Sequence, residues 1–421
     1  MEHKKKWDLA SIATIPLTMT LANSMLIPIL PAMQKKLDIT PFQASLIITV
    51  YAAIAIFFIP IAGYLSDRFG RKAVILPSLF IVAAAGALCG WAAMSLDKAY
   101  SVIIWARLLQ GLGAAGAFPV VLPLVGDMFK REEDVSTGLG IVETANTFGK
   151  VLSPVLGSLL ALWTWYMPFW AIPVFSLLSF FMVIFFVKKP KRESDEKPMS
   201  PGAFLKSIGE LFRENARWLY GILAVGGLGM FIVFGSLFFL SETLEDRGID
   251  GVTKGAILAI PLAGLCTAAY LTGKWIGNKK PLMKWISVIA LALGTAALFA
   301  IALIRSESTW WLVGILTGGS IGLGAALPCL DALLTESIDK KRRGTVTSIY
   351  SSMRFIGVAV GPPVSALLIK SSMETLFYVL GGVSAAACLI VLIAVKPEKD
   401  KAKPKADKPR AGAGGSPAPA R

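Results

Sequence analysis

The sequence predicts an all-α membrane protein with twelve transmembrane helices, arranged as two pseudo-repeated six-helix bundles around a central cavity. Of its 421 residues, 55% are hydrophobic and 16% are charged, with a mean hydropathy of +0.66. A soluble domain carries about 25% charged residues. The apolar residues also form runs of about 20, the length that a helix needs to cross roughly 30 Å of hydrocarbon. Finally, short sequence patterns of the first half of the chain return in the second half.

The apolar runs and the breaks between them predict where each span lies. The expected spans are residues 8–31, 43–65, 73–95, 101–127, 135–162, 165–187, 216–240, 252–276, 283–304, 309–334, 344–369 and 374–395. The longest hydrophilic break divides them six and six. We expect an N-terminal bundle over 1–187, a cytoplasmic linker with an amphipathic segment over 188–215, a C-terminal bundle over 216–395, and a disordered tail over 396–421 whose last ten or so residues look like a cloning remnant.

Three sequence patterns of the first half recur in the second half, at nearly the same distance in residue number. GLGAA at 111–115 returns at 322–326 (offset 211), the Gly-x3-[Ser/Gly]-Pro pattern of 149–154 returns at 357–362 (offset 208), and the glycine before a basic loop at 63 returns at 273 (offset 210). A duplicated six-helix unit with parallel halves is a transporter architecture, and its substrate site lies at the interface between the halves.

Basic residues predict the orientation. With the N-terminus inside, 32 of the 42 Lys and Arg residues fall on inner segments and 7 in outer loops. This asymmetry follows the positive-inside rule, so we expect both termini on the cytoplasmic side of the plasma membrane. Sidedness and the attraction of anionic inner-leaflet lipids account for the net charge of +15, so we expect membrane lipids and no nucleic acid as partners.

Side chains for enzyme chemistry are scarce. The four cysteines fall inside apolar spans without a CxxC pair, and the single histidine, His3, lies in the N-terminal tail. No phosphate-binding loop or nucleophile motif is present in the sequence. We therefore expect no enzymatic activity, no metal site and no cofactor.

Four motifs resemble those of the major facilitator superfamily. The decapeptide GYLSDRFGRK at 63–72 resembles its signature loop, and Arg107 with Gln110 and Gly111 resembles a second motif in the fourth span. Residues 149–158 are similar to the antiporter motif of the fifth span, with serines at two of its glycine positions, and the first span ends in IPILP as in twelve-span drug exporters. The resemblance covers about residues 8–395 and points to the drug:proton antiporter (multidrug efflux) branch.

The signature loop predicts a cytoplasmic gate made of Asp67, Arg71 and Asp127. Asp67 is placed to face the N-terminus of a neighbouring helix such as the eleventh span, and Arg71 to pair with Asp127 at the inner end of the fourth span. Such contacts would form a bistable latch that breaks when the cytoplasmic side opens. The alternative is that this loop is only an orientation signal.

The fifth span predicts close helix packing. Gly149, Ser153 and Gly157 repeat every four residues, Pro154 permits a bend, and the half-repeat supplies Gly361 and Pro362. The resemblance implies that this face packs on the eighth span, between the two halves.

Ionisable residues inside the spans predict the cavity. Each costs roughly 2.5–3.5 kcal/mol at mid-membrane, so a lipid-facing position is disfavoured. One face of the fifth span holds polar residues at i, i+3, i+4 and i+7: Glu143, Asn146, Thr147 and Lys150. Arg354 of the eleventh span and Arg107 of the fourth are expected to join them. The resemblance implies a proton-coupling role for Arg107. The alternative for Glu143 and Lys150 is a purely structural ion pair.

Together these features predict a proton-coupled exporter of small amphipathic compounds that works by alternating access, as a monomer, with the proton gradient as its energy source. Glu143 is the best-placed proton carrier among the carboxylates within the spans. The sequence departs from many of the drug exporters that it resembles, which have an acid in the first span where this chain offers only Asn23. An interior with more basic than acidic groups favours neutral or anionic substrates, whether drugs or endogenous metabolites of a siderophore-like kind. The alternatives are a facilitator-type importer of sugars or organic acids, and a lipid flippase or non-transporting receptor.

Overall fold

The computed structural model describes residues 3–129, 132–187, 201–276, 280–336 and 340–395, and within these ranges every regular element is a helix. The first half contains α1 (His3–Ser24), the 3-10 turn η1 (Ile27–Ile29), α2 (Leu30–Leu37), α3 (Pro41–Phe69), α4 (Arg71–Ser95), α5 (Tyr100–Met128), α6 (Glu132–Ala161) and α7 (Met167–Phe186). The second half contains α8 (Pro201–Asp246), α9 (Gly251–Trp275), α10 (Lys280–Ile304), α11 (Thr309–Glu336), α12 (Lys340–Ile369) and α13 (Met373–Ala394).

The described helices make twelve spans, because α1, η1 and α2 follow one another as a single interrupted span, Trp7–Leu37. Pro28 and Pro31 cause the interruption, since a proline has no N–H to donate and its ring clashes with the preceding turn. Eleven spans are long and apolar enough to cross a membrane on composition alone. The twelfth, α6, is equally long but carries the predicted polar residues.

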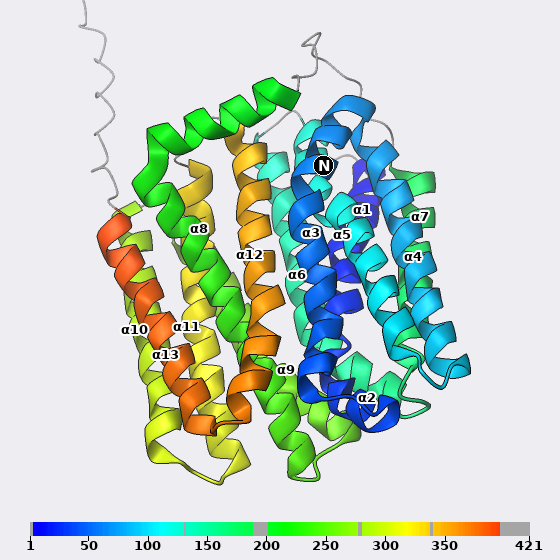
Figure 1. The fold of residues 1–421 in the computed structure, drawn as a ribbon. Helices are drawn as coiled ribbons and strands as arrows, with labels where there is room; N and C mark the ends of the chain where they lie inside the picture. The colour runs from blue at the N-terminus through cyan, green and yellow to red at the C-terminus, as the bar shows by residue number, and fades with distance from the viewer. Residues whose placement is uncertain (1–2, 130–131, 188–200, 277–279, 337–339, 396–421) are drawn as a thin grey trace, which may run out of the picture.

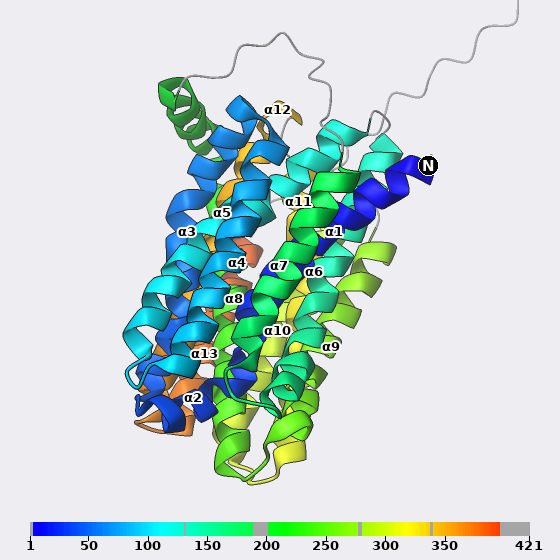
Figure 2. The same cartoon turned by 90° about the vertical axis from the view of Figure 1, so that its right-hand side faces the viewer.

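The same neighbour relationships occur in both halves. Helices α1 and α6 pack together as α8 and α12 do, and the remaining equivalent pairs are α3·α5 and α9·α11, α4·α5 and α10·α11, α4·α7 and α10·α13, and α1·α7 and α8·α13. The halves meet where α3 packs on α12 and α6 packs on α9. Figures 1 and 2 show the two groups of helices side by side. This repetition confirms the predicted pair of six-helix bundles.

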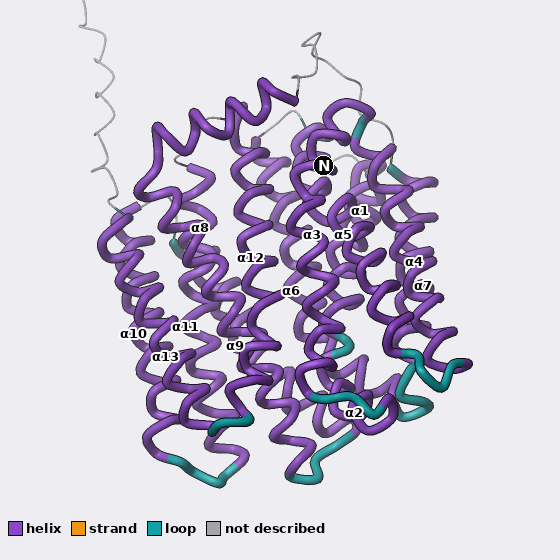
Figure 3. Tube along the Cα trace, viewed as in Figure 1, coloured by secondary structure: helices purple, strands orange, loops and turns teal. Residues whose placement is uncertain are grey.

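The bundle has two ends, which we name by what lies there. The termini face is where α1 begins and α13 ends, and the α2 face is the opposite end, which holds α2 (Figure 1). Figure 3 shows the described connections as short segments at these two ends. The first part of α8 lies across the termini face before the helix enters the bundle. Segments 188–200 and 396–421, which include part of the predicted linker and the whole predicted tail, lie outside the described residues.

The outside of the bundle is apolar. Its exposed side chains include Phe57, Trp105, Phe185, Trp275 and Leu293, each at least 64% exposed. In water such a surface would aggregate, whereas in a bilayer it faces lipid. Polar side chains that avoid this surface are therefore directed to the space between the helices.

Candidate functional site

A small apolar pocket lies where the two halves meet. Its walls come from the first span, α6, α8 and α9, and Lys150 is the one charged side chain among them. The lining residues are Ser24, Ile27, Lys150, Pro154, Met230, Val233, Phe234, Leu237, Leu258, Leu262 and Leu265. A largely apolar pocket with a few polar groups is the usual form of a small-molecule site.

The predicted polar face of α6 forms a hydrogen-bonded chain. Thr20 of α1 donates its hydroxyl to Oδ1 of Asn146 at 2.6 Å, and Nδ2 of Asn146 donates to Oε1 of Glu143 at 3.1 Å. Asn146 is buried, whereas Glu143 is exposed. The amide of Asn146 therefore links the carboxylate to α1 and orients it.

Three further ionisable groups lie near Glu143. Nη1 of Arg354 is 3.8 Å from Oδ2 of Asp331, and its guanidinium lies 5.7 Å from the centre of the Tyr350 ring. Lys150 is within electrostatic range of Glu143, Asp331 and Arg354. We call Glu143, Lys150, Asp331 and Arg354 the central cluster. It joins helix α6 of one half to α11 and α12 of the other.

Glu143 and Lys150 do not form the structural ion pair considered as an alternative. Across the described residues, no bond within 4.0 Å joins their charged atoms. Two turns of helix separate them, which is too far for direct contact along one face. Each charge is therefore available to something other than its neighbour on α6.

Arg107 lies apart from the central cluster. It is 0% exposed and its guanidinium is enclosed by α1, α3 and α5. Its partners are neutral: the Ile47 and Ala22 carbonyl oxygens at 2.8 and 3.0 Å, Oε1 of Gln110 at 2.6 Å, Oδ1 of Asn23, and the Tyr51 ring at 4.5 Å. The structure thus seals Arg107 inside the first bundle. Without it the central cluster holds two cations, Lys150 and Arg354, and two anions, Glu143 and Asp331.

The signature loop makes the predicted ion pair between Arg71 and Asp127 on the termini face. Arg71 donates Nε to Oδ2 of Asp127 at 3.0 Å and Nη1 to Oγ of Ser66 at 2.7 Å, and it also pairs with Asp67. Gly70 separates α3 from α4 with φ +99°, a conformation that favours glycine. The predicted contact of Asp67 with the start of α12 involves side chains 340–345, which lie outside the described ones.

The small residues of α6 pack differently from the expectation. A Cβ added at Gly157 would lie 2.1 Å from the Met25 carbonyl oxygen, and one at Gly149 would meet Leu17 and Thr20. Both glycines therefore face α1 within the same half, not the eighth span, α9. Helix α9 instead packs closely on α6 at Gly255. A Cβ added there would lie 2.4 Å from the Pro154 carbonyl oxygen and 2.6 Å from Oγ of Ser158.

The second half repeats this arrangement. A Cβ at Gly361 would lie 2.7 Å from the Phe231 carbonyl oxygen of α8, so the glycine before Pro362 seats α12 on α8. Ser153, its counterpart in α6, is buried and donates to the Gly149 carbonyl oxygen. The two helices with the Gly-x3-[Ser/Gly]-Pro pattern thus each pack on the first span of their own half.

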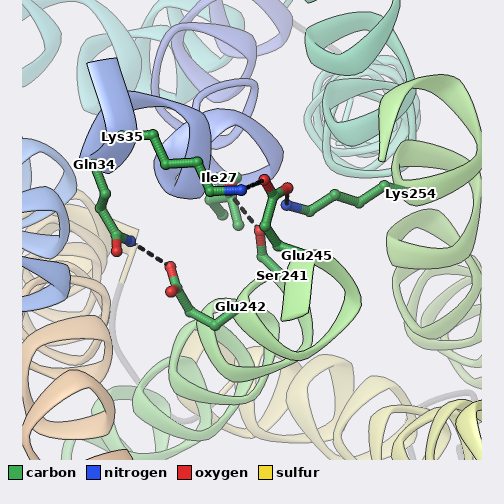
Figure 4. A network of polar contacts seen from close by, with 7 residues as sticks. All are labelled: Ile27, Gln34, Lys35, Ser241, Glu242, Glu245 and Lys254. Carbon is green, nitrogen blue, oxygen red and sulfur yellow. Dashed lines mark hydrogen bonds and ion pairs between the residues drawn. The ribbon is translucent and has the colours of Figure 1, made fainter. Parts of the chain in front are cut away.

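Sequence reasoning missed a polar network on the α2 face, which we call the α2-face latch (Figure 4). Gln34 donates Nε2 to Oε1 of Glu242 at 2.6 Å, and Nζ of Lys35 lies 2.7 Å from Oε1 of Glu245. Both contacts cross from α2 to α8. The network is completed by Lys254, whose Nζ is 3.1 Å from Oε2 of Glu245, and by Ser241, which donates to the Ile27 carbonyl oxygen at 3.0 Å.

The latch closes one end of the interface between the halves. Residues Ile27, Pro28 and Ile29 of η1 are buried beside it. Solvent nevertheless reaches the central cluster, since the Asp331 side chain is 41% exposed and that of Arg354 is 21% exposed. Together with the contacts that join the halves on the α2 face, these exposed fractions indicate access from the termini face.

Comparison with known proteins yields relatives along almost the whole chain. The family model described as Major Facilitator Superfamily matches residues 12–322 and 284–419. The bacillibactin exporter of Bacillus subtilis is 49% identical over 396 residues, which cover 94% of this chain and 98% of that protein. The quinolone resistance protein NorA of Staphylococcus aureus is 23% identical over 381 residues, 89% of this chain and 92% of its own. Among solved structures, a D-xylose-proton symporter matches with a TM-score of 0.74 at 14% identity, covering 93% of this chain and 98% of that one.

Proposed function

Because the chain belongs to the major facilitator superfamily, a family of membrane transporters and not of enzymes, we propose that it is a proton-coupled exporter of small amphipathic compounds. It works in the plasma membrane with both termini cytoplasmic, as an antiporter that exchanges substrate for protons. The similarity to the bacillibactin exporter makes bacillibactin the first compound to test, and the similarity to NorA makes a quinolone the second.

The observation that carries the proposal is the position of the central cluster beside the apolar pocket. Lys150 belongs to both, and the cluster is contributed by both halves. An exporter needs a site that binds an apolar solute and, close by, a carboxylate whose protonation changes the balance of charge. Because the site is shared by two rigid bundles, binding of substrate or a proton there is also coupled to the relative motion of the bundles.

Glu143 is the proposed proton carrier. It is exposed, lies within electrostatic range of Lys150, Asp331 and Arg354, and is oriented by Asn146. Protonation of Glu143 would remove one of two negative charges from a balanced group of four and leave the two cations in excess. Arg107 contributes through position instead: it holds α1, α3 and α5 together, and its influence on coupling passes through α1 to Thr20 and Asn146.

Alternating access then uses the two ends of the interface. With the termini face cytoplasmic, the structure is the inward-open state, held by the α2-face latch. Outward opening requires the contacts of Gln34 with Glu242 and of Lys35 with Glu245 to break. Arg71 with Asp127 and Asp67 keeps the loop between α3 and α4 ordered, so that it closes the cytoplasmic end in the outward-open state.

The test is accumulation of bacillibactin, and separately of a quinolone, in inside-out membrane vesicles energised to an acid interior. We expect wild-type vesicles to accumulate substrate and a protonophore to abolish the accumulation. Glu143→Gln should lose this dependence on the proton gradient. Thr144→Val is the matched control, since Thr144 is an exposed neighbour on α6 whose hydroxyl donates to the Gly140 carbonyl oxygen.

Two results would overturn the proposal. One is accumulation that continues unchanged when the protonophore is present. The other is movement of solute only down its gradient into right-side-out vesicles, which is the behaviour of the facilitator-type importer. Full proton dependence in Glu143→Gln would remove Glu143 from the proposed coupling role.

A further inference from the structure

Resting on the proposed export function, we propose that Lys150 is the specificity-determining residue of the pocket: its ammonium binds the acidic group of an amphipathic anion while the apolar walls hold the rest of the molecule. The substrate class is then an organic acid with a sizeable apolar body, and not a cation or a sugar.

The first argument is the isolation of the Lys150 ammonium. In the described part of the chain, no carboxylate oxygen lies within 4.0 Å of its Nζ, and no hydrogen bond holds it. The other basic member of the cluster differs, because Arg354 already faces Asp331 at 3.8 Å. Glu143 is likewise engaged by Asn146. Lys150 is thus the cation of the cluster that is left for a ligand.

The second argument is the composition of the walls. Of the eleven lining residues, Ser24 is the one with a neutral hydroxyl, Lys150 the one with a charge, and the others are apolar. A cation beside apolar walls loses much of its hydration, and the carboxylates of Glu143 and Asp331 interact with Lys150 without forming an ion pair within 4.0 Å. A bound anion supplies such a pair, and a hydrogen bond to a charged group is stronger than one between neutral groups.

The third argument is the shape of the opposing wall. Met230, Val233, Phe234 and Leu237 come from one stretch of α8, and Leu258, Leu262 and Leu265 from one face of α9. Lys150 and Pro154 lie on α6. A ligand that touches all three helices contacts both halves, with its charged end at α6 and its apolar end against the second half. A sugar would find almost no hydrogen-bond partners on these walls.

The experiment compares two dyes that differ by one anionic group. 8-Anilinonaphthalene-1-sulfonate carries a sulfonate, and N-phenyl-1-naphthylamine is the same aromatic body without it. Their fluorescence is titrated against purified protein in nanodiscs, with empty nanodiscs subtracted. The variants are Lys150→Met, which keeps the length of the side chain, and Lys150→Arg, which keeps the charge. Lys36→Met, at an exposed lysine outside the pocket, controls for the change in net charge.

We expect Lys150→Met to weaken binding of the sulfonate dye by about tenfold or more, the scale of a hydrogen bond to a charged group. Binding of the neutral dye should change by less than about threefold, and Lys150→Arg and Lys36→Met should resemble the wild type. Equal sulfonate affinity in Lys150→Met, or an equal loss for both dyes, overturns the inference. Lys150→Gln replaces Lys150→Met if the latter is not monodisperse.

The dye-binding experiment tests Lys150 independently of the vesicle experiment, which tests the proposed export function. Selective loss of sulfonate binding in Lys150→Met supports the anion site even if vesicles show no proton-driven accumulation. Conversely, proton-driven accumulation with unchanged dye selectivity supports export and removes Lys150 from substrate recognition.

Discussion

Lys35 and Glu245 lie 210 residues apart, and their charged atoms meet at 2.7 Å across the interface between the two bundles. The separation matches the offsets of 208 to 211 at which the two halves repeat. The two residues therefore occupy equivalent positions, at the ends of the first and seventh spans. Gln34 and Glu242 form a second contact between the same two helices.

The first prediction concerns the two lysines that share Glu245. The Lys35 side chain is 70% exposed, whereas Lys254 is 2% exposed. We expect Glu245→Gln to destabilise the protein by about 3–5 kcal/mol, because the Lys254 ammonium would stay buried without its carboxylate. Lys35→Gln should change the unfolding midpoint little, because an ion pair made by so exposed a lysine contributes little and Glu245 keeps Lys254 as its partner.

Thermal unfolding in detergent measures both effects, with Lys36→Gln as the control on the same helix. Similar midpoints for Glu245→Gln and Lys35→Gln would show that Lys254 does not depend on Glu245.

The second prediction concerns opening of the α2 face. Gln34→Glu would place a second carboxylate against Glu242, whose Oε1 now accepts from the Gln34 amide at 2.6 Å. Two ionised carboxylates at this distance repel, so the latch should open at high pH and close again in acid, where one carboxylate is protonated. The readout is labelling of Ser241→Cys, a position 1% exposed in the structure, by a membrane-impermeant maleimide in a background without native cysteines.

Gln34→Leu separates charge from the loss of a hydrogen bond, since it removes the bond and adds no charge. We expect its labelling to rise modestly and without pH dependence. A labelling rate in Gln34→Glu that is the same at all pH values would contradict the role given to this contact.

Much of the fold was predictable, because a helix that crosses a bilayer must be apolar over a fixed length. The predicted spans agree with the helices within about four residues at most boundaries. The exceptions are the first and seventh spans. Their starts were predicted at 8 and 216, whereas α1 begins at His3 and α8 at Pro201, and their ends were predicted at 31 and 240, whereas α2 continues to Leu37 and α8 to Asp246. The extra residues include Gln34, Lys35, Glu242 and Glu245, which hydropathy assigns to loops. In the structure they lie in helices and pair with one another across the interface.

The residues of the site were predictable only where they lie on a single helix. The face of α6 with Glu143, Asn146 and Lys150 follows from helical spacing alone. Arg107 was wrongly expected there, because spacing along α5 gives no information about which neighbouring helices its face meets. Its partners come from α1 and α3, and two of them are backbone carbonyl oxygens that leave no mark in the sequence. The sequence contained one signal for the latch that our prediction did not use. Lys35 and Glu245 have opposite charges and lie 210 residues apart, close to the offset at which the two halves repeat.

The third prediction concerns the contact of α6 with α1. Gly157→Ala would bring a Cβ to 2.1 Å from the Met25 carbonyl oxygen, a backbone atom that cannot rotate away. We expect a loss of about 1–3 kcal/mol of stability, the usual cost of overpacking, with a lower unfolding midpoint and reduced yield. Gly140→Ala is the matched control on the same helix, since a Cβ there would meet nothing within 4 Å.

Gly140→Ala should be neutral or slightly stabilising, because alanine favours the helix over glycine by about 0.5–1 kcal/mol. If both alanine variants unfold at the wild-type midpoint, α1 and α6 are not held at the distance that the structure gives.

The last prediction concerns Asn23 and the buried Arg107. The Arg107 guanidinium has only neutral acceptors among the described residues, and Oδ1 of Asn23 is one of them. Asn23→Leu removes that acceptor and should cost about 1–3 kcal/mol or more, since a donor of a buried cation loses its bond. Asn23→Asp keeps an acceptor in place and adds the missing counter-charge, so it should unfold at or above the wild-type midpoint. The two variants bracket the wild type, and unfolding midpoints in detergent measure both. A lower midpoint for Asn23→Asp than for Asn23→Leu would mean that the first bundle does not hold Arg107 in its charged form.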